Sequence, residues 1–76
     1  MNASRRKELE NIKDELYDLA ERLEQCRDEE EEYRDNMPEN MQNGYRYERA
    51  SEVVDSLCFA IDSLESVMSS LDEVIE

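Results

Sequence analysis

Several residues that support common chemistries are missing or scarce in this chain of 76 residues. It has no histidine and no tryptophan, and only two cysteines. Without an imidazole there is no nucleophilic triad, and two separated cysteines do not form a zinc site. The acidic block 28–32 lacks the glycine and the ligand spacing of a calcium-binding loop. We therefore expect no metal, no cofactor and no enzymatic activity.

Turn-forming residues are equally scarce. One glycine and one proline are too few for the many turns of an all-β fold. A chain of this length forms a single small domain with a modest core, which is marginally stable alone.

Basic residues are few, and their number excludes some partners. Nine Lys and Arg stand against 22 Asp and Glu, for a net charge of −13. Binding to nucleic acid or to an anionic membrane needs a basic surface, so we expect neither. No apolar run approaches the roughly 18 residues of a membrane span. The first residues lack the pattern of a secretory signal, so we expect a cytoplasmic protein with reduced thiols.

The dominant positive feature is apolar periodicity. In the second half of the chain, apolar residues recur in alternating steps of three and four: Tyr47, Ala50, Val54, Leu57, Ile61, Leu64, Met68, Leu71 and Ile75. The first half follows the same pattern, with one charged member: Leu9, Ile12, Leu16, Leu19, Leu23, Cys26, Glu30, Tyr33 and Met37. This spacing is typical of long helices that pack lengthwise on each other.

The boundaries of the two helices follow from capping and turn signals. Asn2 or Ser4 can cap a first helix over about residues 4–35, and Pro38 disfavours helical geometry at the residue before it. The connection 36–44 can contain one short turn after Pro38. Asn43 is a candidate cap for a second helix over about residues 45–75.

Two helices of similar length and a short connection predict an all-α antiparallel hairpin, coiled-coil-like, as a single domain over residues 1–76. In the expected register, Leu16 faces Leu64, and Lys13 lies near Asp72. Met37 and Met41 are expected to cover the loop end of the hairpin, although a binding role for the loop remains open.

A further apolar row on the second helix has no expected partner within the hairpin. Its members are Val53, Ala60, Val67 and Val74, and the adjacent row consists of Ser56, Ser63 and Ser70. The first helix is expected to face this row with Glu8, Glu15, Arg22 and Glu29, which cannot bury it. The simplest solution is a homodimeric four-helix bundle in which two copies of the second helix meet. A heteromeric partner helix, or a monomer in which the row rests on the first helix, remains possible.

The negative charge of the second helix is not neutralised by basic residues of the same helix. Residues 50–76 contain seven acidic and no basic side chains. We take five residues of its outer surface as the candidate partner-binding set: Glu52, Asp55, Phe59, Asp62 and Glu65. A rigid row of carboxylates can imitate a phosphate backbone and bind a basic protein, such as a nuclease or another nucleic-acid-binding protein. Alternatively, the charge only keeps the protein soluble, and Phe59 is an ordinary exposed residue.

One enzymatic alternative concerns two pairs of acidic residues. Glu29-x-x-Glu32 and Glu52-x-x-Asp55 resemble the paired motifs with which all-helical nucleotide pyrophosphatases bind magnesium. In the expected register these side chains face mainly outward, and not into a shared pocket.

Two segments carry a broader resemblance. The run from Glu31 to Gln42, with the loop Asp-Asn-Met-Pro-Glu-Asn, and the run from Ala60 to Glu65 resemble small helical-hairpin proteins of Gram-positive bacteria and their phages. Phage proteins of this size and acidity are often inhibitors of host defence nucleases, including anti-CRISPR proteins. The resemblance therefore implies a protein-binding inhibitor. Together with the acidic surface, it predicts a non-enzymatic DNA mimic or anti-CRISPR-like protein that occupies a basic nucleic-acid-binding surface. The alternative is a structural or assembly protein built on a helical bundle.

Overall fold

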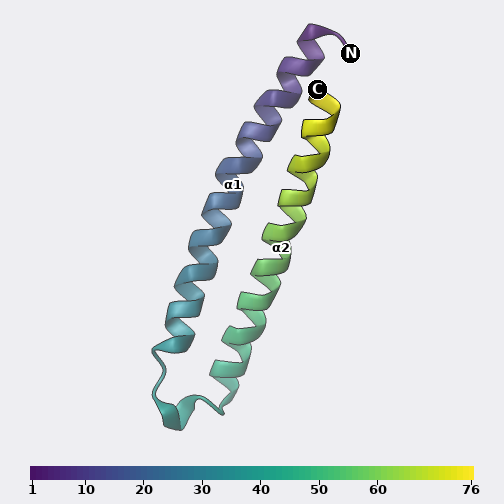
Figure 1. Cartoon of the computed structure of the whole chain (residues 1–76). Coiled ribbons are helices and arrows are strands. Elements are labelled where there is room, and N and C mark those ends of the chain that lie inside the picture. The colour runs from purple at the N-terminus through teal and green to yellow at the C-terminus, as the bar shows by residue number, and fades with distance from the viewer.

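The computed structural model describes all residues from Met1 to Glu76 and contains two long helices. Helix α1 spans Ala3–Asp35, a 3-10 turn η1 spans Glu39–Met41, and helix α2 spans Tyr45–Ile75. The two helices run antiparallel and side by side along their whole shared length (Figure 1). The expected all-α hairpin is confirmed, and both helices begin and end within one residue of the expected positions.

Helix α1 begins at a side-chain cap. The Asn2 carboxamide oxygen accepts a hydrogen bond from the backbone N–H of Arg5 at 2.7 Å, whereas Ser4 already lies inside the helix. This bond satisfies one of the N–H groups that a helix start leaves without a partner. The first turn of α1 extends past the end of α2 (Figure 1).

The connection is tight, and Gly44 makes it so. Gly44 caps α2 in an extended conformation, and its N–H donates to the carbonyl of Met41 at 3.0 Å. A Cβ at this position would lie 3.2 Å from the same oxygen, closer than an ordinary contact. The cap expected at Asn43 was therefore wrong by one residue, because the close approach of the two backbone segments favours a glycine at the cap itself.

One of the two loop methionines belongs to the core. Met37 is buried, and its carbonyl accepts a hydrogen bond from the Gln42 carboxamide at 3.3 Å, while Met41 stays exposed. The loop end is covered by Met37, and the expected contribution of Met41 was wrong.

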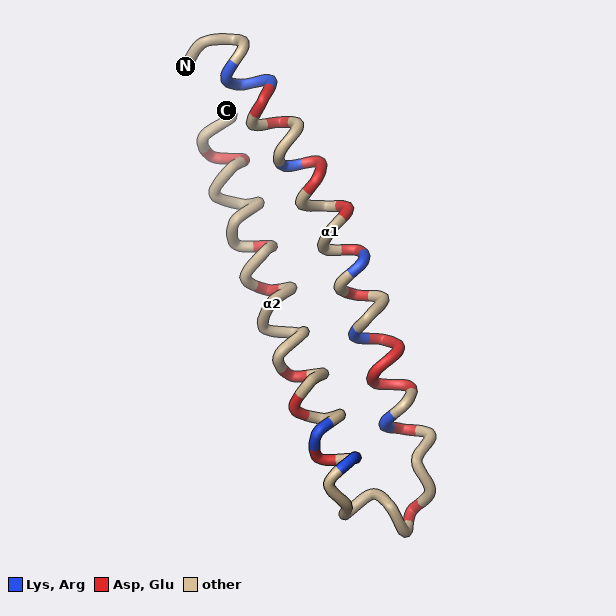
Figure 2. The backbone as a smooth tube through the Cα atoms, turned by 180° about the vertical axis from the view of Figure 1, so that it is seen from behind, with Lys and Arg blue, Asp and Glu red and all other residues tan.

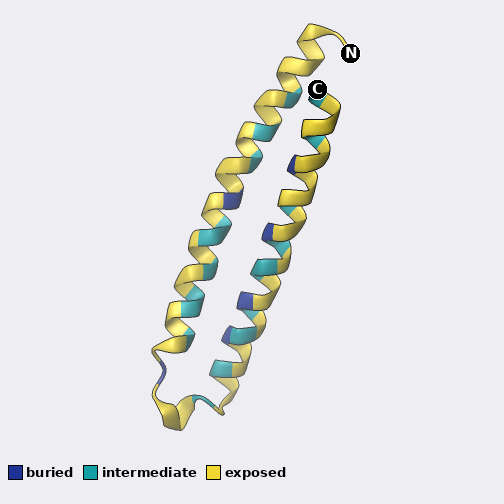
Figure 3. Cartoon of the chain, viewed as in Figure 1, coloured by how far each residue is buried: buried dark blue, intermediate teal, exposed yellow.

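On α2 the expected seam is confirmed. Every member of the row is buried or half-buried. The fully buried positions lie along the inner edge of the helix (Figure 3): Ala50, Val54, Ile61 and Met68.

On α1 only half of the expected seam is confirmed. Leu9, Leu16, Leu23 and Glu30 are half-buried against α2. The alternate row is turned outward: Ile12 is 38%, Leu19 45% and Tyr33 50% exposed, and Cys26 is exposed as well. The row one position further along the chain faces α2 in its place: Lys13, Ala20, Arg27 and Arg34.

The rotation of α1 has a physical reason in these four residues. Ala20 is buried, and its small side chain leaves room on the seam for Met68 of α2. The basic residues cover the seam with their aliphatic stems while their charged heads reach carboxylates at the edge. Lys13 bonds to Asp72 at 2.6 Å, Arg27 to Asp28 at 3.1 Å and Arg34 to Asp35 at 3.0 Å. Met68 lies beside Tyr17 and Ala20, and Leu64 lines a groove with Leu19, Leu23 and Cys26, so the expected facing of Leu16 and Leu64 was wrong.

The burial pattern predicts where the hairpin is sensitive to truncation. We expect Ile61→Ala to lower the free energy of unfolding by about 2–5 kcal/mol, because Ile61 is among the most buried side chains. Phe59→Ala, on the opposite side of the same helix, should change it by less than about 0.5 kcal/mol. Urea denaturation followed by circular dichroism measures both, and equal losses would contradict the packing described.

Candidate interaction surfaces

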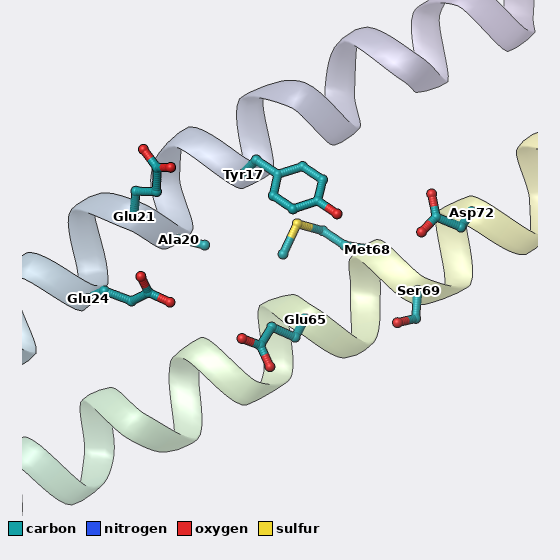
Figure 4. Close-up of a pocket in the computed structure, with 8 residues that line it drawn as sticks. All are labelled: Tyr17, Ala20, Glu21, Glu24, Glu65, Met68, Ser69 and Asp72. Atoms are coloured by element: carbon teal, nitrogen blue, oxygen red, sulfur yellow. The ribbon is translucent and has the colours of Figure 1, made fainter.

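One side of the hairpin, here called the polar side, carries an acidic hollow. It has a volume of about 420 Å³ and lies between the two helices (Figure 4). Four carboxylates and four other residues line it: Glu21, Glu24, Glu65 and Asp72, with Tyr17, Ala20, Met68 and Ser69. The side chain of Met68 points from α2 toward Tyr17 and Ala20 of α1 and forms the apolar floor.

A single ion pair joins the two helices, and it stands on the polar side. The Lys13 ammonium donates to the Asp72 carboxylate at 2.6 Å, as the sequence predicted. This hydrogen bond is the main reason that the pKa of Lys13 is raised above its ordinary value of 10.5, with a smaller contribution from the nearby Tyr17. The pair shows that Lys13 and Asp72 lie at the same level of the hairpin.

Arg27 extends the polar side toward the loop. Its pKa is raised first by the hydrogen bond to Asp28 and to a smaller extent by the neighbouring Cys58 thiol. Cys58 thus lies on the polar side, whereas Cys26 lines a groove on the opposite side of the seam. The two thiols are free and point to different sides of the hairpin.

The opposite side is apolar and receives residues from both helices. A groove there is lined by Leu19, Leu23 and Cys26 with Arg22 of α1, and by Leu64 of α2. Helical periodicity places Ala60 and Val67 beside Leu64 and away from Glu65 and Asp72, which line the hollow on the polar side.

The expected dimer row of α2 therefore shares this side with the outward-turned row of α1. We call the two rows together the apolar face: Ile12, Leu19, Cys26 and Tyr33 of α1, with Val53, Ala60, Val67 and Val74 of α2. Val53 and Ala60 are half-buried, while Val67 is 47% and Val74 52% exposed. Four apolar side chains per helix, seven residues apart, remain without a complete cover inside the hairpin.

Sequence reasoning missed the α1 half of the apolar face. The sequence predicted that α1 presents only charged residues on this side, at positions 8, 15, 22 and 29. The signal that could have revealed it is a seven-residue repeat of Lys13, Ala20, Arg27 and Arg34, in which one small residue stands among long basic ones. Such a row can lie at the edge of the contact with α2, because its long basic side chains cover apolar surface with their stems and keep their charges in water.

The candidate partner-binding residues all lie at the surface of α2. Glu52, Asp55, Asp62 and Glu65 are exposed, and Phe59 is 75% exposed on the outermost position of the helix. Glu52 pairs with Arg49 at 3.3 Å, but Asp55, Asp62 and Glu65 have no ion-pair partner. Helical spacing brings Glu52, Asp55, Phe59 and Asp62 together on the outer face of α2. Glu65 instead lines the hollow on the polar side.

The charge distribution along the chain is visible in the backbone view. Basic and acidic residues alternate along α1, whereas α2 carries basic residues only near the loop (Figure 2). Of the α2 carboxylates that follow Arg49, only Asp72 forms an ion pair with a basic residue of α1.

The acidic pairs of the pyrophosphatase-like alternative are not assembled into a site. Glu29, Glu32, Glu52 and Asp55 are all exposed, and the structure contains no group of three or more acidic or cysteine side chains placed to hold a metal ion.

Neither helix combines the length and the apolar character needed to cross a membrane. No protein-family model, curated protein or solved structure matches the chain.

The Lys13–Asp72 pair gives a prediction about pH. Because the folded pKa of Lys13 is raised, the stabilisation from the pair is complete below pH 10.5 and is lost as the pH rises through the raised value. We expect Asp72→Asn to move the pKa of Lys13 back toward 10.5, and Asp62→Asn, which removes an unpaired carboxylate, to leave it in place. An NMR titration of the Lys13 side chain measures both. If the pKa of Lys13 were the same in Asp72→Asn as in the wild-type chain, the pair would not persist in solution.

Proposed function

We propose that this protein is a non-enzymatic binding module that presents the carboxylates of α2 to a basic protein partner. The observation that carries the proposal is the set of Asp55, Asp62 and Glu65, which are exposed and have no cation beside them. Residues 50–76 supply no basic side chain to neutralise them. An external cationic surface can therefore satisfy charges that the chain itself leaves open.

The rigidity of the hairpin makes this array suitable for recognition. The carboxylates are fixed on one continuous helix of 31 residues, so their spacing is set before a partner arrives. A preorganised row of like charge steers a basic surface and loses little entropy on binding. Phe59 stands among Glu52, Asp55 and Asp62 and gives the surface one apolar anchor, the kind of residue that dominates binding energy in interfaces.

The partner class follows from charge. A row of fixed negative charge competes best with the phosphate backbone for the basic groove of a nucleic-acid-binding protein. The resemblance to small phage hairpins supports an inhibitory role against a host defence nuclease, in the manner of anti-CRISPR proteins. In this proposal the protein is a DNA mimic that occupies the groove in place of nucleic acid.

A second candidate function is supported by the apolar face. A structural or assembly protein would use that face to join helical bundles, and its carboxylates would only provide solubility. The two functions differ in their response to salt, because screening weakens binding through exposed charges and leaves apolar binding largely unchanged.

The charge proposal predicts the outcome of a reversal experiment. We expect the triple change Asp55→Lys, Asp62→Lys and Glu65→Lys to abolish capture of the basic partner, while the helical signal stays intact because all three residues are exposed. A matched control makes the same change of net charge on exposed residues of α1, with Glu10→Lys, Asp14→Lys and Asp18→Lys.

The measurement is a tagged pull-down from bacterial lysate, washed at low and then at high salt, with mass spectrometry of each eluate. A nucleic-acid-binding protein that is released by salt or by added duplex DNA, and that is lost only in the α2 triple variant, supports the proposal. Equal capture by the α2 variant and the α1 control would place the binding site elsewhere. A partner that resists high salt and DNA would favour the assembly function.

A further inference from the structure

The apolar face is built in a way that fits itself. Each helix contributes four apolar residues at seven-residue intervals, and both halves stand on the same side of the hairpin. We propose that this face binds a second copy of the chain about a two-fold axis parallel to the helices. In this arrangement α1 of one copy packs against α2 of the other, and both loops lie at the same end of a four-helix bundle. The inference stands independently of the acidic surface.

The register within one hairpin determines which residues meet across this axis. Rotation about an axis parallel to the helices keeps the height of every residue, so α1 meets the second copy's α2 at the levels fixed by Lys13 and Asp72. At those levels the two apolar rows coincide. The facing pairs are Ile12 with Val74, Leu19 with Val67, Cys26 with Ala60, and Tyr33 with Val53, the second member of each pair belonging to the other copy.

The rims of the face select this arrangement by charge. Outside its apolar row α1 carries the charged residues 15, 22 and 29, whereas α2 carries the neutral Ser56, Ser63 and Ser70. The parallel axis sets Glu15 opposite Ser70, Arg22 opposite Ser63, and Glu29 opposite Ser56. A serine hydroxyl can donate to a carboxylate and accept from a guanidinium, so no charge on the α1 rim meets a like charge.

The other way of pairing two such faces is disfavoured. A two-fold axis perpendicular to the helices brings α1 against α1 and α2 against α2, the pairing that the sequence alone suggested. With the hairpins fully overlapped, Glu15 then lies close to Glu29 of the other copy, and Arg22 lies against its own equivalent. Like charges in such contacts are repulsive. Charge complementarity therefore assigns α1 to α2.

A second copy also answers the weakness of the single hairpin. Only six of 76 residues are buried, and no large side chain is completely covered. Small helical chains commonly gain a sufficient core by association. Each copy carries a net charge of −13, but the unpaired carboxylates of α2 lie on its outer and polar sides, so the apolar face is where two copies repel each other least.

Cysteine cross-linking tests the arrangement directly. One chain is Cys58→Ser, which keeps Cys26 on the apolar face. The other is Cys26→Ser, Cys58→Ser and Ala60→Cys, which carries its single thiol at position 60. We expect the mixture to give a covalent dimer that contains one chain of each kind under mild oxidation, with much less product from either chain alone. The control chain Cys26→Ser keeps only Cys58, on the polar side, and should not cross-link.

Two results of this experiment would overturn the proposal. Cross-linking of the Ala60→Cys chain to itself as fast as to the Cys26 chain would contradict the pairing of α1 with α2. Absence of any cross-link would show that the face does not meet a second copy.

Sedimentation gives an independent readout. The wild-type chain should have twice its mass of 9.0 kDa, and Leu19→Glu or Val67→Glu should halve the observed mass. Both positions are about half exposed within the hairpin, so the helical signal should persist. Phe59→Glu, which changes an exposed apolar residue on the outer face, should remain dimeric. A wild-type mass of 9.0 kDa at every concentration would overturn the inference, whatever the acidic surface binds.

Discussion

The placement of the small Ala20 on the seam, beside Met68 of α2, is the constraint on which the rest of the structure depends. A buried alanine lies beside Met68 on the seam, and the Lys13–Asp72 bond of 2.6 Å marks the level at which the two helices meet. With Ala20 placed there, Lys13, Arg27 and Arg34 lie along the seam with their charges at its edge. The larger apolar residues Leu19 and Tyr33 are then turned away from α2. Both rows of α1 have the seven-residue period needed to pack against α2. Because the row that contains Ala20 faces α2, the hairpin has one polar side and one apolar side.

A chain of this size thereby obtains three different surfaces from two helices. The polar side joins the helices through an ion pair and holds an acidic hollow. The apolar face gathers uncovered aliphatic side chains from α1 and α2, and the outer face of α2 presents carboxylates that no internal cation neutralises. Because these surfaces point in different directions, association through one leaves the others available. The proposed inhibitor and the proposed dimer are therefore compatible, and each can fail without the other.

Much of the architecture could be read from the sequence, because apolar periodicity and capping are local properties. The helix ranges, the α2 seam and the Lys13–Asp72 contact were predicted correctly, and Asn2 was one of the two residues predicted as the cap of α1. The rotation of α1 was not, since Ile12, Leu19, Cys26 and Tyr33 are more apolar than the residues that replaced them at the seam. Hydrophobicity favours burying that row within one hairpin, whereas the small Ala20 beside Met68 and the reach of the basic side chains favour the row that is observed. The five candidate partner-binding residues stay a prediction, because exposure and charge identify a surface but not what it binds.

The central claim is that the apolar face is covered by a second hairpin lying alongside the first. Small-angle X-ray scattering tests it most directly, since it measures mass and length together. The account predicts a particle of twice 9.0 kDa whose longest dimension stays close to the 60 Å of one hairpin, because two copies overlap along their full length. A particle of 9.0 kDa over the whole concentration range, or a dimer nearly twice as long as one hairpin, would contradict it.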